Sequence, residues 1–238
     1  MSGRFFSRFL LVTWMSAGPA SGAQWTGEAG IGLLATRGNS DTESLSGKLL
    51  LDTVRERWKN SFTATAINSG DDQGRTVERY AVGDKLDYHL SEHNYLFAAL
   101  DWEKDLFGAY RERTSQVIGY GRHLLTGPVH LLDLEFGAGA RQTEEQNTGQ
   151  RESEAIGRLG GKYIWTVSDT SALAQSIKID TGSSNTSTEA ITELKLTVVG
   201  NLFTALSFTL RHNSDVPVDT DKTDTVTAAT LSYAFGGR

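Results

Sequence analysis

The chain has 238 residues, with 23 lysine or arginine side chains, 29 aspartate or glutamate side chains and a net charge of −6. This acidic balance argues against a protein that binds nucleic acid through a general basic surface. The lack of cysteine excludes disulfides, thiolate zinc sites and cysteine nucleophiles, and a mean hydropathy of −0.32 without a long apolar run in the body of the chain excludes a helical membrane protein.

The first 23 residues have the features of a secretory signal peptide. Arg4 and Arg8 give a positive start, residues 9–15 form a short apolar segment, and small residues follow up to Ala23. The apolar segment is too short to span a bilayer, and the small residues fit cleavage after Ala23. The alternative is a buried N-terminal helix. We expect an exported protein whose residues 24–238 form a single domain.

The remainder of the chain reads as a series of strands. Segments of about ten alternating residues are separated by turn clusters, which is the spacing of strands that cross a membrane at a tilt. The predicted strands are 26–36, 42–54, 58–68, 77–90, 95–103, 113–123, 129–141, 153–166, 172–180, 189–199, 202–212 and 225–235. We therefore predict an all-β fold, a closed antiparallel up-and-down transmembrane β-barrel of about 12 strands.

The connections between these segments alternate in length. The short ones are 55–57, 91–94, 126–128, 167–170 and 200–201. Most of the others are longer and more polar: 69–76, 105–112, 142–152, 181–188 and 213–224. An outer-membrane barrel has tight turns at one rim and longer loops at the other. A soluble exported barrel with a lipid-binding cavity is the alternative architecture.

Aromatic residues gather at the predicted strand ends. Those at the short-turn end are Trp25, Trp58, Tyr88, Tyr95, Tyr163, Trp165, Tyr233 and Phe235. Amphipathic rings concentrate where lipid meets water, so these residues predict one of the two aromatic bands of a membrane barrel. Ordinary core packing is the alternative explanation.

Several short motifs occur in an order that resembles a known family. They are GNSDT at 38–42, ERWKN at 56–60, YHLSE at 88–92, YLFA at 95–98, RHNS at 211–214, TDT at 223–225 and YAF at 233–235. Together they resemble the salt-stress-induced outer-membrane protein family over about residues 25–235. The resemblance implies an outer-membrane barrel, a Gram-negative envelope location and, by name only, a link to salt stress. It implies no catalytic or ligand-binding residue.

Charged side chains of both signs occur in the middle of the predicted strands, on the face opposite the apolar one. We predict that they face the lumen: Lys48, Asp52, Arg79, Lys85, Asp87, Asp101, Glu103, Arg122, Asp133, Glu135, Arg158, Lys162, Lys178, Asp180, Glu193, Lys195 and Arg211. About twelve strands leave a lumen between the filled interior of eight strands and the open channel of sixteen. The charges either line a pore for small solutes or ions, or pair and plug the lumen.

An enzyme is the alternative function. His212 and Ser214 lie two residues apart, and an acid such as Asp221 follows, which is the composition of a serine hydrolase acting on lipid A or on esters. The pattern is short and the third member is not determined by spacing, so no catalytic residue is assigned. The other explanation is a polar strand end that runs into an acidic loop.

No cofactor or metal site is predicted. The acidic loop residues Asp71, Asp72, Asp219, Asp221 and Asp224 could hold a hard cation, but their spacing matches no calcium loop. The expected partners are outer-membrane lipids, lipopolysaccharide, and the barrel-assembly machinery with periplasmic chaperones. The expected location is the cell outer membrane.

Overall fold

The computed structural model describes residues 22–36, 42–71, 74–146, 148–216 and 221–237. They form twelve strands: β1 (Gln24–Thr36), β2 (Thr42–Arg55), β3 (Trp58–Asp71), β4 (Gly74–His89), β5 (Asn94–Asp105), β6 (Tyr110–Thr126), β7 (His130–Glu145), β8 (Arg151–Ser168), β9 (Ser171–Thr181), β10 (Thr186–Val199), β11 (Leu202–Asn213) and β12 (Thr223–Gly236). The described residues include no helix that is long and apolar enough to cross a membrane.

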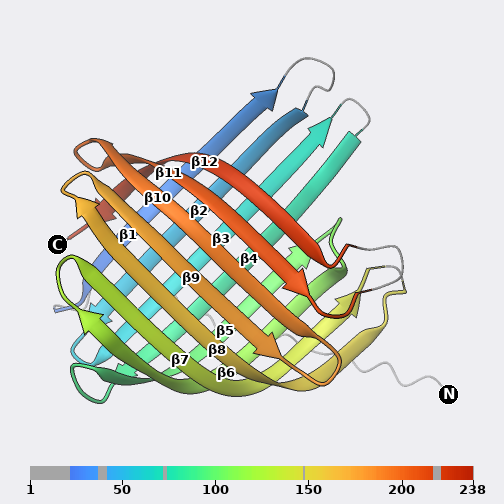
Figure 1. Cartoon of the computed structure of the whole chain (residues 1–238), viewed down its shortest axis with the longest axis horizontal. Helices are drawn as coiled ribbons and strands as arrows, with labels where there is room; N and C mark the ends of the chain where they lie inside the picture. The colour runs from blue at the N-terminus through green and yellow to red at the C-terminus, as the bar shows by residue number, and fades with distance from the viewer. Residues whose placement is uncertain (1–21, 37–41, 72–73, 147, 217–220, 238) are drawn as a thin grey trace.

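The strands form one closed antiparallel barrel. Each strand pairs with the next along the chain, and β12 pairs with β1 from Thr26–Gly236 to Ile31–Leu231, which closes the sheet. Closure removes free strand edges, which would otherwise expose unpaired backbone groups. In Figure 1 the near strands β9–β12 cross the far strands β1–β4, as expected of strands that tilt around a barrel. The predicted architecture is confirmed.

Side chains alternate between the lumen and the outer surface because the side-chain period of a strand is two. In β6, Val117 is 2% exposed and faces the lumen, while the next residue, Ile118, is 71% exposed and faces outward. The outer surface is mostly apolar along every strand. Asp84 is an exception on β4, where it accepts a hydrogen bond of 2.9 Å from the side-chain amide of Asn60.

The two rims of the barrel differ less in loop length than the sequence predicts. At the short-turn end the connections are residues 56–57, 90–93, 127–129, 169–170 and 200–201, and at the loop end they are 37–41, 72–73, 106–109, 146–150, 182–185 and 214–222. Most connections at the loop end are longer than the short turns, as predicted, but they are shorter than the predicted bounds. The polar segments assigned to loops continue the backbone pairing of the strands beyond the apolar part of the wall.

Four of the predicted band aromatics lie exposed near the short-turn end. Trp25, Trp58, Trp165 and Tyr233 are between 40% and 52% exposed. Tyr95 does not belong to this band, because it is 2% exposed and its hydroxyl donates to Glu135 on the lumen side at 2.7 Å. Tyr95 begins a strand, as the residues of the aromatic band do, but the alternation of side chains along β5 places it on the lumen face.

A small apolar cluster packs against one wall of the lumen. It consists of Tyr95, Phe97, Val117 and Ile156. The Tyr95 ring lies over Gly121 so closely that a Cβ there would overlap it. Glycine at this position therefore makes room for the ring, and the cluster narrows the lumen on the side of β5–β8.

Candidate functional site

The lumen contains two neighbouring hollows. The loop-end hollow has a volume of about 70 Å³, and the main cavity, which extends to the short-turn end, has a volume of about 490 Å³. Both are lined by the same six charged side chains: Asp101, Glu103, Arg158, Lys178, Glu189 and Arg211. We call these six residues the charged ring. It separates the two hollows and contains three acids and three bases.

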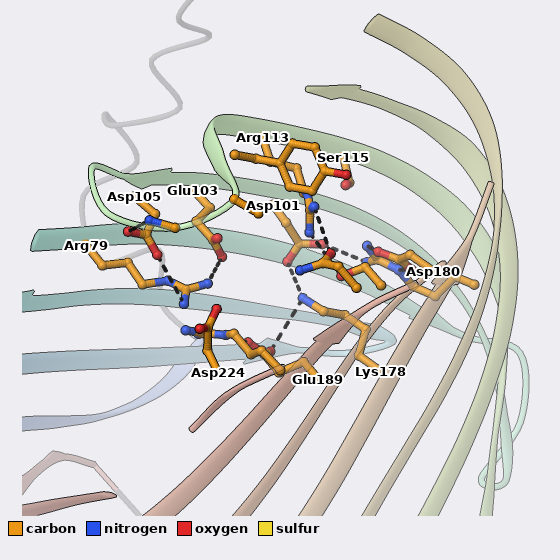
Figure 2. Close-up of a pocket in the computed structure, with 17 residues that line it drawn as sticks. Arg79, Asp101, Glu103, Asp105, Arg113, Ser115, Lys178, Asp180, Glu189 and Asp224 are labelled. Carbon is orange, nitrogen blue, oxygen red and sulfur yellow. Dashed lines mark hydrogen bonds and ion pairs between the residues drawn. The ribbon is translucent and has the colours of Figure 1, made fainter. Parts of the chain in front are cut away.

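Asp101 connects strands of the ring that are not neighbours in the sheet. From β5 its carboxylate contacts the Arg158 guanidinium on β8 at 2.7 Å and the Lys178 ammonium on β9 at 3.7 Å. Arg158 also donates to both carboxylate oxygens of Asp180, at 2.6 and 2.7 Å. Figure 2 shows Asp101, Lys178 and Asp180 extending toward one another from different strands. A bidentate arginine–carboxylate pair is a strong and directional contact, so this part of the ring is held firmly.

Further contacts cross the lumen on the loop side of the ring. The Arg113 guanidinium on β6 donates to Ser187 on β10 at 3.0 Å and to Asn213 on β11 at 3.1 Å. The Tyr110 hydroxyl donates to the backbone carbonyl of Asp215 at 2.9 Å. Ala109, in the β5–β6 connection, is 7% exposed and lines the loop-end hollow. The loop end is therefore the narrower end of the lumen.

Arg79 on β4 adds another buried base next to the ring. It is 8% exposed and forms ion pairs with Glu103 and, at 3.6 Å, with Asp105. Asp224 on β12 lines the same hollow, and Figure 2 shows it near Arg79. This arrangement extends the mixed charge of the ring toward the loop end.

Ion pairs nearer the short-turn end are more accessible. The Lys48 ammonium on β2 contacts Glu193 on β10 at 2.5 Å, and Lys195 contacts Glu28 on β1 at 2.7 Å. The side chains of Lys195 and Glu28 are 30% and 31% exposed. These pairs join β10 to β1 and β2, on the side of the barrel where the sheet closes.

A second group of charges lies on the opposite wall of the main cavity. Lys85 contacts Asp87 at 2.9 Å and Glu135 at 2.5 Å, and its ammonium lies 5.0 Å from the centre of the Tyr95 ring. His123 contacts Asp133 at 2.6 Å. The polar lining and the apolar cluster thus meet at Tyr95.

The structure brings most of the predicted lumen charges to these surfaces. The predicted residues that line one or both hollows are Arg79, Lys85, Asp87, Asp101, Glu103, Asp133, Glu135, Arg158, Lys162, Lys178, Asp180 and Arg211. Lys48, Glu193 and Lys195 are joined by ion pairs, and Asp52 accepts a hydrogen bond of 2.6 Å from Ser61.

The prediction for Arg122 is wrong. Arg122 is exposed and shares the outward face of β6 with Ile118 and Tyr120. The two inward positions before it, Gly119 and Gly121, have no side chains to mark the lumen face, and the polar inward residue His123 follows it. The polarity of Arg122 therefore suggested the wrong face.

Sequence reasoning missed several residues of the site. They are Glu28, Arg113, Arg141, Glu154 and Glu189, all of which take part in lumen ion pairs or hydrogen bonds. Arg141 is the most buried of them, at 1% exposed. Continuing the alternation to the strand ends would have found Glu189, because it has the same parity as Glu193 and Lys195 on β10.

The residues of the hydrolase alternative do not form a catalytic arrangement in the described part of the chain. The His212 ring contacts the Thr223 hydroxyl at 2.9 Å, and the Ser214 hydroxyl donates to Asn185 at 3.2 Å. No hydrogen bond between described residues joins His212, Ser214 and Asp221 to one another.

The candidate cation loops are described only in part. The side chain of Asp71 and all of Asp72 and Asp219 lie outside the described residues. Within the residues that are described, no group of three or more His, Asp or Glu side chains has an arrangement that could hold a metal ion.

The comparisons with known sequences find one family. Residues 29–235 match the model of the family described as "Protein of unknown function, DUF481". A curated relative, the "Uncharacterized protein YdiY" of Escherichia coli (strain K12), is 28% identical over 219 residues, which cover 91% of this chain and 86% of the relative. The matched residues agree closely with the resemblance seen in the sequence. The family description does not mention salt, so the link to salt stress stays a prediction.

Solved structures share the fold at low sequence identity. The NanC porin has a TM-score of 0.52 at 8% identity, with 90% of this chain and 99% of that chain covered. The COG4313 outer membrane channel from Pseudomonas putida F1 has a TM-score of 0.51 at 13% identity, with 92% and 97% covered. These likenesses show that the chain has the fold of outer-membrane channel proteins.

Proposed function

This chain belongs to the DUF481 family, and we propose that it forms a narrow channel for small polar solutes or ions in the bacterial outer membrane. The observation that carries the proposal is the charged ring, which lies between a cavity of about 490 Å³ and a hollow of about 70 Å³ at the loop end. Charged side chains that surround a pore select solutes by the diameter of the pore and by the electric field of their charges, without one tight binding site.

The outer surface supports a membrane location. It is apolar along the strands and carries exposed tryptophans near the short-turn end, as a barrel in contact with lipid requires. Export through a cleaved leader of residues 1–23, contact with lipopolysaccharide, and assembly by periplasmic chaperones and the barrel-assembly machinery are parts of the same proposal. Heat-modifiable gel migration of the membrane fraction tests it, and recovery in the soluble periplasm would contradict it.

A structural barrel without conductance is the second candidate. The contacts of Arg158 and Arg113 favour it, because they join strands that lie three to five positions apart around the narrow end of the barrel. Ion pairs inside a narrow lumen are screened less than exposed pairs, so salt alone need not open them.

Single-channel recording in a planar bilayer separates the two candidates. We expect the folded protein to give small, stepwise conductance. Replacing Asp101 with Ala removes the acid that holds Arg158 and Lys178 from across the lumen, so the conductance should rise on the order of twofold or more.

The matched control is Asp169→Ala, in the exposed β8–β9 turn. It removes the same charge away from the lumen and should conduct like the wild type. A silent bilayer with both the wild type and Asp101→Ala, when folding is confirmed in the same samples, would leave only the structural barrel.

The proposed link to salt stress is tested separately. We expect the amount of this protein in the outer membrane to rise when cells grow in added NaCl. An unchanged amount would remove that part of the proposal and leave the channel untouched.

A further inference from the structure

Two lysines in the main cavity have no acidic partner among the residues that the structure describes. Lys59 on β3 and Lys162 on β8 both line this cavity. The ion pairs of the described residues include neither of them. They differ in this respect from Lys48, Lys85, Lys178 and Lys195, which all contact carboxylates.

The reason is that the acid opposite each lysine contacts another base. Lys59 is paired across the strands with Asp87, whose carboxylate contacts Lys85 at 2.9 Å. Lys162 is paired in the same way with Asp133, which contacts His123 at 2.6 Å. Both ammonium groups therefore have donors free for a ligand.

The surroundings of the two lysines suit a small, oxygen-rich ligand. Ser61, Thr63 and Thr65 follow Lys59 on the lumen face of β3 and line the same cavity. Asp52 is not among the lining residues, and its carboxylate accepts the Ser61 hydroxyl at 2.6 Å. Lys162 is exposed to the interior, so a solute in the cavity can reach it.

We propose that Lys59 and Lys162 form a binding site for small oxyanions, carboxylates or phosphate, within the main cavity. Lysine ammonium groups bind such anions as compact charges with three donors each. This site would determine which class of solute the proposed channel selects. The biological role of the site therefore rests on the proposed channel function. The binding itself is measurable without any conductance.

Isothermal titration of the folded barrel tests the site. The protein is held in an uncharged detergent at low ionic strength, without phospholipid, so that the only phosphate present is the one added. Inorganic phosphate and succinate are titrated in separate arms, with choline chloride as the cationic comparison. We expect saturable binding of at least one anion, no saturable signal from choline, and weakening as NaCl is added.

The Lys59→Gln/Lys162→Gln double variant should lose at least about tenfold in affinity. The Lys222→Gln control should bind like the wild type, because Lys222 lies in the β11–β12 connection, where its ammonium donates to the Ser214 carbonyl at 2.8 Å. Unchanged binding by the double variant, or no anion binding by the wild type, would overturn the site.

Conductance of the same preparations separates this inference from the proposed function. A conducting wild type that binds neither anion overturns the site alone. Anion binding that disappears in the double variant, in a barrel that never conducts, supports the site and overturns the channel.

Discussion

Both halves of the lumen are lined by charged side chains at alternate strand positions, but these side chains are buried in one half and accessible in the other. In the loop-end half, Arg158 and Asp180 are each 6% exposed, and Arg158 on β8 also contacts Asp101 on β5, three strands away. In the short-turn half, Lys195 on β10 contacts Glu28 on β1, which is also three strands away, but both side chains are about 30% exposed. The comparison teaches that inward charge alone does not determine whether a barrel is open. What differs between the two halves is how deeply the paired side chains are buried.

The largest expected effect on stability comes from removing the buried ion pair of the loop-end half. Replacing Arg158 with Ala leaves the Asp180 carboxylate buried without its bidentate partner. The free energy of unfolding should fall by about 3–5 kcal/mol, because a buried charge is left uncompensated. Urea unfolding in lipid vesicles, followed by tryptophan fluorescence, measures this change.

The matched control is Arg151→Ala, which breaks the pair with Glu144 at 2.8 Å while the Arg151 side chain is 78% exposed. This pair should contribute less than about 1 kcal/mol. If both arginine variants lost the same free energy of unfolding, burial of the ion pair in the ring would not contribute to stability.

A smaller effect is expected from the apolar cluster that narrows the short-turn half. A Gly121→Ala substitution places a Cβ in the space occupied by the Tyr95 ring, so the ring must move. Overpacking of this kind should cost about 1–3 kcal/mol in the free energy of unfolding. The same unfolding measurement applies.

Gly157→Ala provides the comparison for that variant, because a Cβ at this outward position meets nothing within 4 Å. Its effect should stay within about 0.5 kcal/mol. If Gly121→Ala is equally neutral, the cluster is loose and does not shape the cavity.

The smallest effect is expected from the accessible pairs of the short-turn half. Glu28→Gln removes the partner of Lys195, and since both side chains are about 30% exposed the loss should be below about 1 kcal/mol and should shrink in high salt. A loss as large as that of Arg158→Ala would contradict the distinction between the two halves.

Much of the fold follows from local pattern. The two-residue alternation and the turn clusters predict twelve strands, a closed antiparallel sheet and the face on which most charges lie, because a strand places successive side chains on opposite sides whatever its neighbours are. The boundaries at the loop end were not predictable in this way. Polar residues there resemble loops in sequence, and only their backbone pairing shows that the strands continue.

Pattern also failed where a face carries no side chains. The prediction that Arg122 faces the lumen is wrong because the two inward positions before it, Gly119 and Gly121, have no side chains to mark the lumen face. The prediction that Tyr95 belongs to the aromatic band is wrong because a place at a strand start does not determine which way the side chain points. Both errors come from reading residue type where only alternation within the folded strand gives the direction.

The sequence by itself determined that this protein is a barrel with an apolar outside and a charged inside, since those properties depend on neighbours along the chain. Only the tertiary structure decided which charges meet. Asp101 reaches Arg158 across 57 positions of sequence. Within the described part of the chain, Lys59 and Lys162 pair with no acid, because Lys85 and His123 contact the acids opposite them. Such pairings depend on the closure and tilt of the barrel, which bring distant strands to the same level, and no local spacing encodes that level.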